Sequence, residues 1–172
     1  MVSTVKYEIV KRLNKVEIRH YPSMVIAKVE GYEDQGFNLL FRFISGENKQ
    51  KSKVKMTAPV VSQRIEMTAP VLSDTGSLAF VMPEGFRLET TPEPTDERVK
   101  IYELPERLVA ALRFSGRWSS SLFEKKTGEL LKELGNAKIK TKGNVFSMLY
   151  NAPFTPSFIR RNEVAVDIEL KA

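Results

Sequence analysis

The chain has a single histidine, and its position suits metal chemistry. In Val16-Glu17-Ile18-Arg19-His20-Tyr21, His20 follows Val16 and Ile18 at every second position, so a β-strand here places the imidazole on the same face as these apolar residues. A neutral imidazole in apolar surroundings is a good ligand for iron. The alternative is a structural, hydrogen-bonded histidine at a strand end. The pattern makes His20 a candidate metal ligand and leaves both roles open.

Two near-copies of one phrase carry the candidate thioether ligands. Lys55-Met56-Thr57-Ala58-Pro59-Val60 is followed eleven residues later by Glu66-Met67-Thr68-Ala69-Pro70-Val71. A proline lacks the N–H of a central helix and keeps the preceding alanine extended, so each copy is expected as a short β segment. Met56 and Met67 could donate sulfur to iron, although core packing of a flexible side chain competes with that role.

Glu103 is a candidate pocket acid. It follows Val99 and Ile101 at alternate positions, and it lies 83 residues after His20. A carboxylate on an apolar strand face is costly unless it is paired, so a cationic ligand would explain it. The alternative is a solvated residue at a strand end, which the following Leu104-Pro105 makes plausible.

A helix is expected over residues 34–44, with Gly46 as its stop. Its apolar arc is about 200° wide, where a core-facing helix needs roughly 100°. The arc comprises Phe37, Leu39, Leu40, Phe41, Phe43 and Ile44. We expect Leu39 and Phe43 to be the apolar residues in excess of what core packing needs, and to line a ligand groove. The alternative is that loops or a partner subunit cover these two side chains. Arg42 lies about 60° from Leu39 on the helical wheel, so it would flank that groove, unless it is simply solvated.

A second helix is expected over residues 121–134, with a capping box from Ser121 and Glu124 and a C-terminal cap at Gly135. Its expected buried residues are Leu122, Phe123, Thr127, Leu130, Leu131 and Leu134. Alternating apolar residues predict strands near residues 16–21, 25–30, 77–82 and 164–170.

Identities at the constant offset of 83 indicate an internal repeat. Val16, Ile18, Pro22 and Ala27 match Val99, Ile101, Pro105 and Ala110. The repeats would span about 15–90 and 99–170, joined by a polar, proline-rich loop at 90–96. Neither half has enough core alone, so one fused domain over residues 1–172 is expected. The predicted fold class is α+β: a pseudo-two-fold duplicated unit whose twisted antiparallel sheet, or distorted barrel, is flanked by two helices.

Composition excludes several classes of site. No cysteine is present, which excludes disulfides, iron–sulfur clusters and covalent c-type heme attachment. Lysine and arginine number 27 against 21 acids, a net charge of +6, but no aromatic residues interleave with the lysine runs, so no nucleic-acid partner is expected. No secretory leader or transmembrane stretch is apparent, which favours a cytoplasmic protein.

Several segments together resemble the SOUL heme-binding protein family. They are Lys55–Val60, the strand segments Tyr7–Val10 and Glu17–Tyr21, the turn Gly46-Glu47-Asn48, and the C-terminal Tyr150–Phe154 and Arg160–Val164. The resemblance implies non-covalent binding of heme or a related tetrapyrrole, for buffering, transport or sensing. It implies His20 as a candidate axial ligand, as proposed for animal SOUL proteins, although other members bind without it.

Two alternatives stay open beside heme. Glu103 would be the pocket acid of a small-molecule module similar to the multidrug-binding GyrI-like domains, or the chain would be an interaction protein with a vestigial pocket. No serine-nucleophile, zinc-protease, phosphate-loop or dinucleotide motif is present, so no enzymatic activity is expected.

Overall fold

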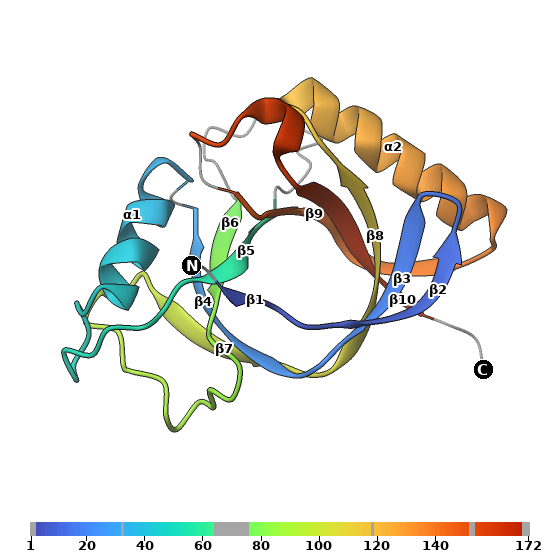
Figure 1. Ribbon diagram of the computed structural model, residues 1–172. Helices are drawn as coiled ribbons and strands as arrows, with labels where there is room; N and C mark the ends of the chain where they lie inside the picture. Colours follow the sequence, from blue (N-terminus) through green and yellow to red (C-terminus); the bar gives the residue numbers. More distant parts are fainter. Residues whose placement is uncertain (1–2, 32, 64–75, 118, 152–153, 170–172) are drawn as a thin grey trace. The chain divides into compact units, whose positions relative to one another are not determined.

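The computed structural model describes residues 3–31, 33–63, 76–117, 119–151 and 154–169 (Figure 1). These residues form two compact units. Unit 1 comprises residues 1–5 and 23–105, and unit 2 comprises residues 6–22 and 106–172. Each unit contains one long helix packed on antiparallel strands, so the fold class is α+β as predicted.

Unit 1 has the strand order β5–β6–β4–β7, with every pair antiparallel, and β1 runs parallel to β5. Its elements are β1 (Ser3–Thr4), β4 (Met24–Glu30), α1 (Glu33–Ile44), β5 (Thr57–Gln63), β6 (Ser77–Val81) and β7 (Lys100–Leu104). Helix α1 packs on β4 and β6. The core beneath it combines Leu40 and Phe43 of the helix with Val25, Ala27 and Phe80 of the strands.

Unit 2 has the strand order β2–β3–β8–β10–β9, again antiparallel throughout. Its elements are β2 (Glu8–Leu13), β3 (Val16–Tyr21), β8 (Arg107–Phe114), α2 (Ser120–Asn136), β9 (Lys140–Leu149), the 3-10 turn η1 (Ser157–Ile159) and β10 (Asn162–Glu169). The α2-facing core contains alternate strand residues, among them Val16, Ile18, Val164 and Val166, against Leu130. Among the described strands of each unit the pairings form an open path that does not close into a barrel.

The end of α1 is built by residues after it. Gly46 takes φ +115°, a left-handed conformation that only glycine adopts cheaply. The buried side-chain amide of Asn48 donates to the carbonyls of Phe43 and Ser52, and its oxygen accepts from the Ser52 N–H. These bonds hold the segment after α1 against the helix end, and they confirm Gly46 as the stop.

The predicted caps of α2 were wrong. Ser119, not Ser121, is the N-cap, since its hydroxyl accepts from the Leu122 N–H at 3.1 Å. Gly135 lies inside the helix, and Ala137 is the C-cap. Serines at three consecutive positions could each cap the helix, so the sequence pattern alone did not identify Ser119. Leu131, expected in the buried stripe, is 43% exposed, because the helix rests on Leu130 and Leu134.

The first copy of the repeated phrase forms a strand, as predicted. Thr57–Val60 begins β5, and the Ala58–Pro59 peptide bond is cis. The register with β6 shifts between Thr57 and Val60, where the proline interrupts the ladder. The second copy, residues 66–71, lies outside the described residues.

The two units share one pairing order. The path β7–β4–β6–β5 of unit 1 corresponds to β3–β8–β10–β9 of unit 2, and a helix follows β4 and β8 alike. Each unit includes strands from the other half of the sequence: β2 and β3 join unit 2, where β3 pairs with β8, and β7 joins unit 1, where it pairs with β4. The internal duplication stays a prediction, and so does the single domain over residues 1–172.

Candidate functional site

The structure contradicts the predicted groove at Leu39 and Phe43. Their exposed fractions are 6% and 1%, and both belong to the unit 1 core together with Val54 and Val99. The crevice beside them has a volume of only about 10 Å³. The loop before β7 supplies Val99 and covers this side of the helix, so Leu39 and Phe43 are structural residues, and no porphyrin edge fits beside them.

The apolar surplus of α1 lies instead at Phe37 and Phe41, which are 45% and 48% exposed. Their rings stack with centroids 6.1 Å apart and an interplanar angle of 11°. Phe37 is anchored edge-on against Phe80 at 5.2 Å. The width of the apolar arc correctly indicated a surplus. The sequence did not show which side the following loops would cover, so the exposed pair was missed.

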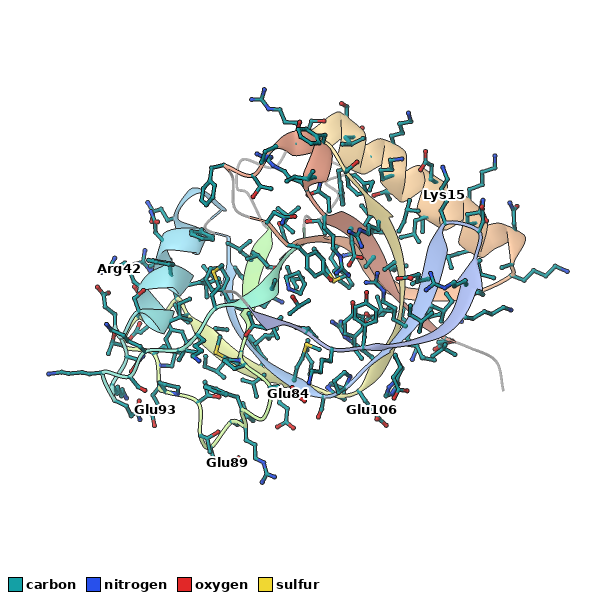
Figure 2. All side chains as sticks on the ribbon, viewed as in Figure 1. Lys15, Arg42, Glu84, Glu89, Glu93 and Glu106 are labelled. Carbon is teal, nitrogen blue, oxygen red and sulfur yellow. The ribbon has the colours of Figure 1, made fainter. Side chains whose placement is uncertain are left out.

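Arg42 is exposed near the C-terminal end of α1 (Figure 2). Its Nε donates to Oε2 of Glu47 at 2.8 Å, and both side chains are well exposed. A solvated ion pair of this kind contributes little to stability, so its guanidinium is available to an incoming anion at small cost.

His20 is 36% exposed on β3 of unit 2. Its Nε2 lies 3.4 Å from Oε2 of Glu106, a more exposed side chain. His20 shares a strand face with Val16 and Ile18, as predicted, but those two residues are fully buried and it is not. An iron atom that binds His20 at Nε2 would have to displace the Glu106 carboxylate.

Of the two candidate methionine ligands, Met56 is partly buried and packs against the unit 1 core. That contact supports the core-packing role. Met67 lies outside the described residues.

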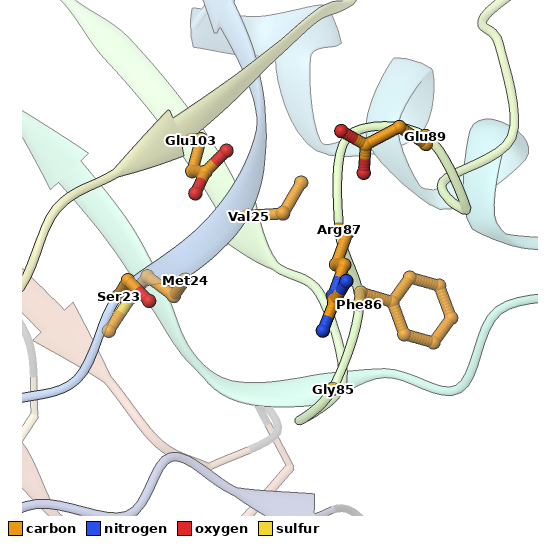
Figure 3. Close-up of a pocket in the computed structure, with 8 residues that line it drawn as sticks. All are labelled: Ser23, Met24, Val25, Gly85, Phe86, Arg87, Glu89 and Glu103. Atoms are coloured by element: carbon orange, nitrogen blue, oxygen red, sulfur yellow. The ribbon is translucent and has the colours of Figure 1, made fainter.

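Glu103 lines a pocket of about 460 Å³ in unit 1 (Figure 3). It extends from β7, beside the start of β4, and the facing wall is the loop after β6. The lining residues are Ser23, Met24, Val25, Gly85, Phe86, Arg87, Glu89 and Glu103. Sequence reasoning named Glu103 alone, because the loop residues that complete the pocket are fourteen or more positions away in the chain.

A buried charge cluster occupies the face of the unit 2 sheet opposite α2. We define it as Arg19, Glu163, Glu17, Tyr21, Tyr150 and Arg161. Arg19 Nη1 donates to Glu163 Oε1 at 2.7 Å and Nη2 to Oε2 at 2.5 Å. Tyr150 donates to Glu163 at 2.7 Å, Arg161 at 3.2 Å, and Arg19 also bonds Glu17 and Tyr21.

The pKa values in this cluster follow from burial and pairing. Burial opposes the charged form of Glu163, but hydrogen bonds and the charge of Arg19 outweigh it and hold its pKa below the usual range. The pKa of Arg19 is raised by the same pair against the same burial. Burial and the Glu163 carboxylate together raise the pKa of Tyr150, which stays neutral. At the centre of the cluster, Arg19 and Glu163 thus form an ionised pair, and Tyr150 is a neutral hydrogen-bond donor to Glu163.

Among the described residues, no group of three or more His, Asp or Glu side chains is arranged to hold a metal ion. No helix in that part of the chain is long and apolar enough to span a membrane.

A protein-family model described as SOUL heme-binding protein matches residues 2–167. The chain belongs to the SOUL heme-binding protein family. Heme-binding protein 2 of Mus musculus is 31% identical over 160 residues, which cover 86% of this chain and 75% of that protein. The segments that carry the family resemblance, Glu17–Tyr21 and Arg160–Val164, also supply most of the buried charge cluster.

Solved structures similar to this SOUL-family chain share its fold at low identity. The C-terminal domain of EcmrR has a TM-score of 0.63 and 8% identity, covering 95% of this chain and 98% of that one. SAV2435 bound to tetraphenylphosphonium has a TM-score of 0.52 and 9% identity, covering 95% and 94%. At such identities the similarity concerns the fold alone.

Proposed function

We propose that the chain binds heme or a related tetrapyrrole non-covalently, with one porphyrin face against Phe37 and Phe41 of α1. The observation that carries this proposal is the stacked, half-exposed pair Phe37 and Phe41. Membership of the SOUL heme-binding family supports it. Buffering, transport and sensing are the uses that reversible binding would serve.

The chemistry of the α1 surface matches the ligand. A porphyrin has broad apolar faces, and transfer of apolar area from water is favourable by about 25 cal/mol per Å². Two rings already held parallel lose little freedom on contact with a flat ligand. Arg42 lies about 100° from Phe41 around the helix, so its long side chain would have to reach a propionate at the porphyrin edge, whose carboxylate a guanidinium matches in geometry. Arg42 would exchange its partner Glu47 for the propionate, at small cost because the Arg42–Glu47 pair is exposed.

Hemin titration of the wild-type chain and a Phe41→Asp variant tests the proposal. We expect a shifted Soret band in the wild type and loss of binding in the variant, because a carboxylate against the porphyrin is costly to desolvate. Leu131→Asp on α2 is the matched control, since Leu131 is a similarly exposed helical residue in the other unit. A wild-type chain that leaves the hemin spectrum unchanged would overturn the proposal, and so would equal loss in both variants.

Small-molecule binding at Glu103 is the second candidate function, and one observation favours it. The 460 Å³ pocket lies within the size range of ligand sites and brings the predicted acid to its wall. Its ligand would carry a positive charge. Glu103→Gln should weaken such a ligand selectively, and equal binding by variant and wild type would remove this candidate.

A further inference from the structure

The Glu103 pocket contains charges of both signs. Glu103 and Glu89 contribute carboxylates, and Arg87 contributes a guanidinium (Figure 3). All three residues are exposed. Within the described residues none of these three side chains has an ion-pair or hydrogen-bond partner, although they line one opening. Opposite charges that share a pocket without pairing are free to bind opposite ends of a ligand.

The loop that carries Arg87 is held in place by hydrogen bonds within the loop. The Arg87 N–H donates to the Thr90 hydroxyl at 3.0 Å, and the Arg87 carbonyl accepts from the Thr91 hydroxyl at 2.6 Å. The Phe86 N–H donates to the Pro83 carbonyl. The base of the Arg87 side chain is therefore positioned before any ligand arrives, which reduces the ordering cost of binding.

The pocket also has an apolar wall. Phe86 is half-buried and packs against the unit 1 core, which includes Val25. Met24 is partly buried at the start of β4. Both residues line the pocket, and an aromatic ring and a flexible thioether suit a compact apolar or aromatic group on the ligand.

We propose that this pocket binds a small zwitterion, an amino acid or short peptide with an apolar side chain. The ammonium group pairs with Glu103 and Glu89, the carboxylate pairs with Arg87, and the side chain lies against Phe86 and Met24. A ligand with only positive charge would be repelled by Arg87 and would leave that guanidinium without a partner. The presence of both charges in the lining therefore favours a zwitterion over a simple cation. The inference rests on the second candidate function, small-molecule binding at Glu103, and adds the ligand class.

Three related probes test the charge requirement by NMR titration at millimolar concentration. L-phenylalanine has both charges, its methyl ester keeps only the ammonium, and N-acetyl-L-phenylalanine keeps only the carboxylate. We expect L-phenylalanine or the dipeptide Phe-Gly to bind, and removal of either charge to weaken affinity about tenfold, the effect of one lost ion pair.

Variants locate the two interactions. Glu103→Gln should reduce affinity for L-phenylalanine and the methyl ester, but not for the N-acetyl compound. Arg87→Gln should reduce affinity for L-phenylalanine and the N-acetyl compound, but not for the methyl ester. The matched controls are Glu97→Gln, an exposed acid of unit 1 outside the pocket, and Arg113→Gln, an exposed arginine of unit 2.

The outcomes distinguish the zwitterion inference from the candidate function on which it rests, small-molecule binding at Glu103. If the methyl ester binds as tightly as L-phenylalanine, and Glu103→Gln weakens it, small-molecule binding at Glu103 stands and the zwitterion inference is wrong. If none of the probes binds, both fail. Heme binding at α1 is measured separately and is affected by neither result.

Discussion

Arg19 and Glu163 form a two-point ion pair in the interior of unit 2, with exposed side-chain fractions of 1% and 0%. The two residues lie 144 positions apart in the sequence. They come from β3 and β10, which both pair with β8. A buried pair of this kind is stabilising only while both charges and their hydrogen bonds are satisfied. Glu17, Tyr150 and Arg161 complete those bonds.

Removal of one member of the pair should destabilise the protein strongly. Arg19→Met leaves Glu163 buried without its main partner, and we expect a loss of about 3–5 kcal/mol in the free energy of unfolding. Urea denaturation monitored by circular dichroism measures it. The double variant Arg19→Met with Glu163→Met should recover part of the loss, because no uncompensated charge remains. Additive losses in the double variant would contradict this account.

Stability should fall in acid because of Glu163. Its pKa is lower in the folded chain than in the unfolded chain. The contribution of the pair is therefore complete above about pH 4.3, the ordinary pKa of glutamate, and is lost as the pH falls through the depressed value. Thermal unfolding from pH 7 to pH 3 measures the effect. A Glu163→Gln protein should show a shallower dependence, and an unchanged slope would count against Glu163 as the source.

Phe43→Ala should act on stability rather than through a ligand groove. Phe43 is 1% exposed in the unit 1 core, so its truncation should cost about 3–5 kcal/mol. Phe41→Ala, on the exposed side of the same helix, should cost at most about 1 kcal/mol. Chemical denaturation of both variants checks the contrast. Equal costs would mean that the two faces of α1 are wrongly assigned.

Arg42→Glu should weaken hemin binding about tenfold, through repulsion of the propionates and loss of one ion pair. Its effect on stability should be small, since its partner Glu47 is exposed. Absorbance titration at low salt measures the affinity. Lys132→Glu, the same charge reversal at an exposed position on α2, is the control. If the two variants behave alike, only the net charge matters and Arg42 is not at the site.

His20→Ala should leave most of the hemin affinity and spectrum intact if the porphyrin binds to the α1 surface. His20 belongs to unit 2, and its Nε2 already faces Glu106. The Soret band of the variant, compared with that of the wild type, is the measurement. A sharp spectral change would instead show that an iron–nitrogen bond is lost, and would establish His20 as the axial ligand.

Local patterns in the sequence predicted most of the elements. Alternation placed β3, β4, β6 and β10 within two residues of their observed bounds, because a strand with one buried face must alternate. The apolar arc and Gly46 located α1. The helix caps of α2 were less predictable, since several serines could each supply the same hydrogen bond.

The candidate sites depended on contacts that no local pattern encodes. Arg19 and Glu163 alternate with apolar residues, as solvent-facing charges do, and only the pairing of β3 and β10 with β8 brings their strands together. The loop before β7 covers the side of α1 that carries Phe43, so Phe43 is buried and Phe41 remains exposed. By itself the sequence determined the family, both helices, several of the strands and the isolated acid at Glu103. The tertiary structure decided which charges pair and which remain free, because burial and pairing depend on residues distant in the chain.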